Sequence, residues 1–230
     1  MSKIKKLFAD LANLFTEKLI ADLLFGLQII GAFIVCSTQF FRMLQSIKGV
    51  VFSQFILIEV YALFQLWLAV HANRAKPSRI AKQTIVIYIT WFTLLLTNVA
   101  AVFINGNYMW GNSDSWTILA VVILTLLAIW HAKSKNLTIS DPMIKGVVGS
   151  SVKAIPQFVM AWKIALEGGL GVPGVAVFTS NFNILVRIGQ LVMSIRQVGW
   201  DKNRRWMLVT ESLNYLSWFA VTVAWALWRW

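Results

Sequence analysis

Residues 83–104 read QTIVIYITWFTLLLTNVAAVFI, a stretch that contains no Asp, Glu, Lys or Arg. A hydrocarbon core of about 30 Å requires roughly 20 apolar residues of helix, so this stretch is long enough to cross a bilayer. Further predominantly apolar stretches lie on both sides of it, separated by short polar connections such as residues 73–82. The seven candidate spans are 20–41, 50–71, 83–104, 115–132, 145–166, 172–195 and 206–228. The sequence therefore predicts an all-α integral membrane protein with seven transmembrane helices.

The overall composition agrees with a chain that has almost no soluble portion. Hydrophobic residues make up 58% of it and charged residues 13%, about half the charged fraction of a typical soluble domain. The formal net charge is +12, but the basic residues lie in the connections and do not interleave with aromatic residues on one face. Anionic lipid headgroups are therefore the expected partner of these charges, and nucleic acid is not.

Few residues are available for a metal site or for catalysis. Cys36 is the single cysteine and lies inside an apolar span, while His71 and His131 are far apart and have no carboxylate or cysteine at ligand spacing. The chain has no HExxH sequence, paired acidic metal motif or Ser–His arrangement. We expect no metal ion, no other cofactor and no enzymatic activity, although an intramembrane enzyme with dispersed residues stays open as an alternative.

Residues 1–18 have a pattern of their own. Leu7, Leu11 and Leu14 recur at helical spacing, and lysines gather near the start. This pattern predicts a short amphipathic helix that lies on the membrane surface before the first span. A cleaved signal peptide is the alternative.

The basic residues also predict an orientation. We call the side of the membrane that holds the N-terminus side A and the opposite side side B. Most Lys and Arg of the connections fall on side A, whereas residues 104–116 on side B contain neither. Because positive residues mark the cytoplasmic side, we expect a cytoplasmic N-terminus and an external C-terminus in a cell (inner) membrane.

The first and fifth spans share a pattern that indicates an internal repeat. Gly31 precedes Gln39-Phe40 at the same spacing at which Gly149 precedes Gln157-Phe158. A short polar step with glycine follows each, and the third and seventh spans each contain an Asn, at positions 98 and 214.

These matches favour two parallel three-helix units, residues 19–105 and 144–230, with residues 115–132 as a linker helix. A linker that crosses the membrane once lets both units keep the same orientation, as in transporters built from parallel repeats.

The second unit resembles a known signature. Lys153-Ala154-Ile155-Pro156-Gln157-Phe158 is followed by Trp162-Lys163 and then by Gly168-Gly169-Leu170. This is similar to the PQ-loop motif, and the three-plus-one-plus-three layout resembles the PQ-loop and SWEET sugar transporters and the related Pnu vitamin transporters. The first unit has Thr38-Gln39 where the family has Pro-Gln. The predicted orientation is the reverse of that of SWEET proteins and closer to the orientation expected of the Pnu branch.

Polar residues within the spans indicate a central cavity. Asn183, Arg187 and Gln190 share one helical face, which cannot comfortably meet lipid. We expect a solute-binding cavity rather than only hydrogen bonds between helices, which are the alternative for each amide. Its predicted lining consists of Asn98, Asn181, Asn183, Asn214 and Gln157, with Trp91 and Trp218 as aromatic walls.

Charged residues and a proline complete the set of candidates. Arg187 is predicted to pair with Glu211 as a buried bridge or gate, with Lys153 as a further partner. Glu59 lies deeper in the second span and has no evident cation nearby. Pro156 is interpreted as a hinge, with a static kink as the alternative.

The predicted function is facilitative transport of a small polar, neutral solute, sugar-like or vitamin- or nucleoside-like, by alternating access. The alternative is a receptor or assembly protein of the same fold that does not move its ligand. Membrane lipids are expected partners, and a second copy of the chain stays open as one.

Overall fold

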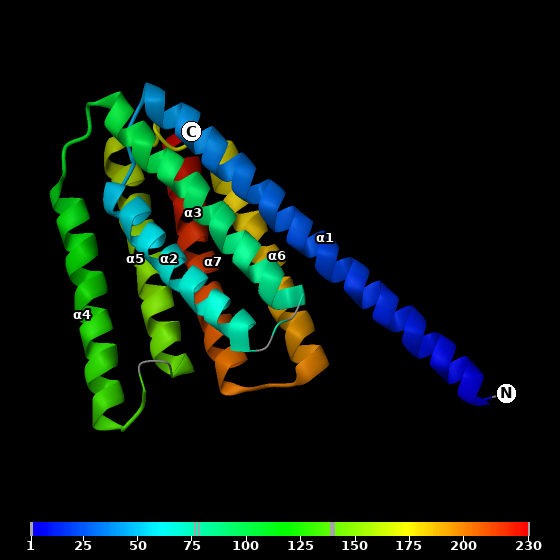
Figure 1. Cartoon of the computed structure of the whole chain (residues 1–230). Helices are drawn as coiled ribbons and strands as arrows, with labels where there is room; N and C mark the ends of the chain where they lie inside the picture. Colours follow the sequence, from blue (N-terminus) through cyan, green and yellow to red (C-terminus); the bar gives the residue numbers. More distant parts are fainter. Residues whose placement is uncertain (1, 76, 78, 139–140, 230) are drawn as a thin grey trace.

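The structure is a computed structural model that describes residues 2–75, 77, 79–138 and 141–229, with side chains described from residue 18 onward except at 72, 80, 197 and 198. The described residues form seven α-helices and no strand. The helices are α1 Ser2–Gln45, α2 Phe52–Ala75, α3 Arg79–Asn105, α4 Asn112–Ser134, α5 Pro142–Glu167, α6 Gly174–Val198 and α7 Lys202–Arg229. They run alternately in opposite directions (Figure 1), so the N-terminus lies at the same end of the bundle as the α2–α3, α4–α5 and α6–α7 connections. That end is side A.

Five of the helices are long and apolar enough to cross a membrane. The segments that meet both conditions are Lys18–Gln45, Phe52–Ala75, Ala81–Asn105, Asn112–Ser134 and Gly174–Arg196. They account for five of the seven apolar stretches expected from the sequence. The chain is therefore an all-helical protein with the helices of a membrane-embedded one.

Helix α1 differs from the expectation of a separate surface helix over residues 1–18. Residues 2–45 form one uninterrupted helix, which is about 66 Å long at 1.5 Å per residue and exceeds a bilayer of about 45 Å. Its N-terminal part extends away from the other helices (Figure 1). The physical reason is local: residues 2–18 contain neither Pro nor Gly, so nothing in the backbone ends the helix before the apolar stretch begins.

The helices pack as two similar triplets, which we define as α1–α3 and α5–α7. In the first triplet α3 packs against both α1 and α2, and in the second α7 packs against both α5 and α6. The triplets meet where α1 packs on α6 and α2 packs on α5. Helix α4 lies outside, against α5 and α2 (Figure 1). The space between the triplets is therefore bordered by helices of both.

A polar stripe joins α5 to α7. The hydroxyl of Thr210 donates to the Gly146 carbonyl at 3.1 Å, and the Lys153 ammonium lies 2.7 Å from the Glu211 carboxylate. One turn further along α5, Gln157 donates to Asn214 at 3.1 Å and accepts a hydrogen bond from the Ser217 hydroxyl. Residues at such spacing share one helical face. The polar groups of these two helices thus satisfy each other, which allows both helices to carry polar side chains at buried positions.

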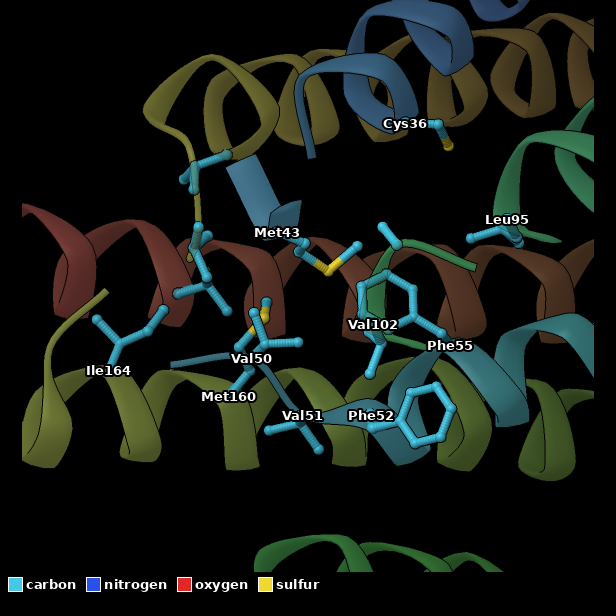
Figure 2. Close-up of a cluster of buried hydrophobic side chains, with 14 of the residues drawn as sticks. Cys36, Met43, Val50, Val51, Phe52, Phe55, Leu95, Val102, Met160 and Ile164 are labelled. Carbon is cyan, nitrogen blue, oxygen red and sulfur yellow. The ribbon is translucent and has the colours of Figure 1, made fainter. Parts of the chain in front are cut away.

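An apolar cluster fills the side-B half of the space between the triplets. Figure 2 shows Met43, Val50, Val102, Met160 and Ile164 converging from elements of both triplets. All five side chains are at most 4% exposed. Their burial joins the two triplets near side B without any polar contact with lipid.

Side chains and backbone also hold the two triplets together at side B. Gln39 donates to the Gly171 carbonyl at 2.8 Å, Arg42 Nε donates to the Leu170 carbonyl at 2.5 Å, and the Gly171 N–H donates to the Lys48 carbonyl at 2.9 Å. A Cβ atom at Gly171 would lie 2.6 Å from the Ser46 carbonyl oxygen, so this close approach requires glycine. We call these contacts the side-B clamp.

The ion pairs described at side A lie within single triplets. Asp22 of α1 pairs with Arg79 of α3, and Asp141 before α5 lies 2.8 Å from Lys202 of α7. The hydrogen bond from Lys202, together with the Met143 backbone N–H, holds the pKa of Asp141 below its usual range. The described polar contacts at side B therefore connect one triplet to the other. The described ion pairs at side A connect helices within the same triplet.

Candidate solute-binding cavity

A cavity of about 190 Å³ lies between the two triplets. Helices α1, α2, α3, α5, α6 and α7 all contribute side chains to its wall. An apolar cavity of about 150 Å³ in another protein holds a benzene molecule, so the space suits a ring-sized solute.

Most of the residues predicted for the site line this cavity. The described wall includes Asn98, Asn183, Asn214, Gln157, Trp91, Trp218, Arg187, Glu211 and Lys153. These residues come from α3, α5, α6 and α7, and the packing of the triplets brings them together.

The structure places Asn181 outside this wall. Its amide nitrogen donates to the Val177 carbonyl and to the Thr222 hydroxyl, both at 2.8 Å, so it joins α6 to α7 and is not part of the wall. The physical reason is helical geometry. Residues two apart on a helix point in different directions, and it is Asn183 that faces the cavity.

Several polar side chains of the wall have buried atoms without a hydrogen-bond partner in the protein. These atoms are Gln28 Oε1, Gln54 Oε1, Asn98 Oδ1 and both amide atoms of Asn183. More than nine in ten buried polar groups normally have a partner, and an unmade hydrogen bond costs about 1–3 kcal/mol. Four amides with unpartnered atoms around one space are therefore suited to the polar groups of water or of a solute.

Two glycines allow the triplets to approach each other beside this space. A Cβ atom at Gly31 of α1 would lie 2.0 Å from Asn183 Oδ1 of α6, and one at Gly149 of α5 would lie 2.9 Å from the Tyr61 hydroxyl of α2. Tyr61 and Asn183 occupy the same position relative to the start of their helices. Each contact thus joins the first helix of one triplet to the second helix of the other.

The charged residues form a cluster in which Glu211 lies closer to Lys153 than to Arg187, the partner that the sequence suggested first. Lys153 is the nearest cation to Glu211, with 2.7 Å between Nζ and Oε1, whereas Arg187 Nε lies 3.9 Å from the same oxygen. Asn214 also donates to Glu211, at 3.2 Å. Glu211 is thus the centre of the cluster and Lys153 its closest partner, because the α5–α7 stripe places these two side chains face to face.

Aromatic side chains supply the apolar part of the wall. Trp91 of α3 and Trp218 of α7 were expected there, and Tyr61 and Tyr88 join them. The Lys153 ammonium lies 5.6 Å from the centre of the Tyr61 ring, a distance at which a cation is attracted to the ring face. Flat apolar surfaces and charges therefore meet in one cavity.

Sequence reasoning missed Gln28, Gln54 and Tyr88. The signal that could have found the glutamines is their position, because a Gln within or at the edge of an apolar span is expensive in lipid and needs an internal partner. Tyr88 has no comparable signal, since Tyr is also common at membrane interfaces.

Glu59 lies outside the wall. Both oxygens of its carboxyl group are buried and have no hydrogen-bond partner. Among the residues whose positions are described, no group of three or more His, Cys, Asp or Glu is arranged to hold a metal ion.

Pro156 is buried within α5, which continues through it. Its ring removes the backbone hydrogen bond to the carbonyl four residues earlier. Its neighbours Lys153 and Gln157 are both bonded to α7. The proline is therefore a weak point in a helix that is otherwise held to its neighbour on both sides.

We predict that Pro156→Ala slows transport severalfold and leaves solute affinity nearly unchanged, because the substitution restores a backbone hydrogen bond without touching the cavity wall. Binding and flux measured on the same purified variant test this. Equal losses of binding and flux would show that the proline shapes the static site instead.

No family model, curated protein or solved structure matches the chain. The case for a function is therefore built from the cavity itself.

Proposed function

We propose that this protein is a facilitative membrane transporter that carries a small polar solute through the central cavity by alternating access. The observation that carries the proposal is the set of buried amide atoms without a partner on Gln28, Gln54, Asn98 and Asn183, around a space of ring size. In a membrane, such groups need a polar occupant.

The arrangement of the triplets supports alternating access. A cavity at the boundary between two similar helical units can open to either side when one unit rocks against the other. The side-B clamp joins the two triplets to each other at side B. At side A, the described ion pairs connect helices of the same triplet and do not join one triplet to the other. This pattern fits a state closed at side B.

We also propose that all seven helices cross the membrane and that the triplets are two parallel repeats, as in the PQ-loop, SWEET and Pnu transporters that the sequence resembles. The α5–α7 stripe supports crossing by these two helices, because their polar groups face each other and not lipid. The equivalent contacts at Gly31 and Gly149 support the repeat.

The orientation can be tested directly. Because basic residues gather on side A, a cysteine at Asn203 should react with a membrane-impermeant thiol reagent only after the membrane is opened, and a cysteine at Ser113 should react in intact cells. Cys36→Ala provides the background, since the native thiol is buried. The reverse labelling would contradict a cytoplasmic N-terminus.

The amide wall can be tested through Asn183. Asn183→Ala should weaken solute binding by about 5- to 30-fold, the effect of losing one hydrogen bond of about 1–2 kcal/mol. The matched control is Asn181→Ala, since that amide is bonded to α7 outside the wall. The experiment is a solute screen by thermal shift followed by uptake into proteoliposomes. A folded Asn183→Ala protein with unchanged binding and flux would contradict the cavity, and binding without any flux would favour a receptor.

A further inference from the structure

The charges in the cavity wall do not balance. Lys153 and Arg187 both face the single carboxylate of Glu211, at 2.7 Å and 3.9 Å. The three side chains are 19%, 23% and 9% exposed, so water screens them only in part. One carboxylate cannot neutralise two cations, and an unbalanced charge is expensive at membrane depth.

Arg187 is the cation whose N–H donors are mostly unused in the described contacts. A guanidinium carries five N–H donors, and the one hydrogen bond described for this group is a long one of 3.5 Å to Gln190. The distance to Glu211 is beyond hydrogen-bond range. The group lines the cavity, one helical turn from the unpartnered amide of Asn183 on the same face of α6.

The other acidic side chain nearby leaves this imbalance in place. Glu59 lies on α2, is outside the cavity wall, and forms no ion pair with Lys153 or Arg187 among the described contacts. The rest of the described cavity wall carries amides and apolar side chains but no further carboxylate, and the rings of Trp91 and Trp218 belong to it.

We infer that the solute of this cavity is an amphipathic monoanion, whose acidic group binds the Arg187 guanidinium and whose ring or apolar body lies against the tryptophans. A guanidinium presents parallel donors that match the two oxygens of a carboxylate or sulfonate. Such a ligand supplies the missing negative charge and uses the free donors together. The inference deepens the proposed transport function and rests on it for the role of the site, and it replaces the neutral solute that the amides alone suggested.

The test compares two probes of nearly equal shape, benzenesulfonate and its neutral analogue benzenesulfonamide. Binding to the purified protein is measured by calorimetry and thermal shift. We expect benzenesulfonate to bind at least about tenfold more tightly, because a charge-assisted hydrogen bond is lost in the amide. Arg187→Gln should remove this preference by weakening sulfonate binding about 10- to 100-fold.

Two further variants separate recognition from general effects of charge. Arg196→Gln makes the same change on an exposed residue of α6 outside the wall and should leave binding unchanged. Glu211→Gln should act in the opposite direction to Arg187→Gln. It frees both cations, so it should bind benzenesulfonate more tightly than the wild type and gain more thermal stability from it.

Transport is measured separately by counterflow of benzenesulfonate, which stays charged and does not cross bilayers unaided. Binding with the expected Arg187 dependence but without counterflow would support the anion site and overturn the transport proposal. Counterflow of benzenesulfonamide above that of protein-free liposomes, without counterflow of benzenesulfonate, would support transport and overturn the anion. Failure of benzenesulfonate to bind at millimolar concentration, or a preference for it that survives Arg187→Gln, would also overturn the inference.

Discussion

Glu211→Gln is expected to destabilise the protein by about 3–5 kcal/mol when no anion is bound. The carboxylate is the centre of a cluster that holds Lys153 at 2.7 Å, Arg187 at 3.9 Å and the Asn214 amide at 3.2 Å. Removing its charge leaves two cations facing each other in a space of low dielectric. The loss of a buried partner is far more damaging than the net value of the ion pair itself.

The measurement is reversible unfolding in detergent or bicelles for a double-mutant cycle between Glu211→Gln and Lys153→Met. A coupling of at least about 1 kcal/mol is expected for residues in contact. Glu167→Gln is the matched control, since it removes the same charge from an exposed position at the end of α5, where changes stay within about 0.5 kcal/mol. Additive effects at residues 153 and 211 would contradict the cluster.

The second large effect concerns the side-B clamp. Cysteines introduced at Arg42 and Leu170 and joined by a short bis-thiosulfonate reagent should abolish solute flux, and reduction should restore it. The two positions are connected in the structure by the hydrogen bond from Arg42 Nε to the Leu170 carbonyl. A transporter must break this contact to open at side B, and a covalent link forbids that step.

Binding supplies the internal check on this experiment, because solute should still reach the cavity of the linked protein from side A. The matched control is a link between cysteines at Asp22 and Arg79, which are paired within the first triplet and should move together. Full flux through the Arg42–Leu170 link would contradict alternating access between the triplets.

The sequence predicts the helices well because the signal for them is long and local. An apolar stretch such as residues 83–104 must be helical in a membrane, because a helix satisfies the backbone hydrogen bonds within the segment itself. The boundary at residue 18 could not be predicted in the same way, because an amphipathic pattern in residues 1–18 is equally compatible with a separate helix and with a continuation of α1. The absence of Pro and Gly from residues 2–18 favours the continuous helix, but it does not by itself exclude a separate one.

The site was predictable as a set of polar residues but not as a geometry. Polar groups within spans are expected to face inward, and Asn98, Asn183 and Asn214 line the cavity. The rotation of α6 about its axis decides between Asn181 and Asn183, and that rotation is set by contacts such as Asn183 against Gly31. The preference of Glu211 for Lys153 over Arg187 likewise depends on how α5 meets α7.

The polar stripe between α5 and α7 also constrains how the protein is made. Helix α5 leaves the ribosome before α7, so for a time Lys153 and Gln157 have no partner within the second triplet. A lone lysine near the middle of a span is expensive to insert. If α5 crosses the membrane as proposed, it would have to wait in the translocation channel, or at the polar surface of the bilayer, until Glu211 and Asn214 are synthesised. On the proposed seven-crossing layout, we therefore expect the second triplet to enter the membrane as a unit, and we expect α5 to insert poorly when synthesis stops before α7 is complete.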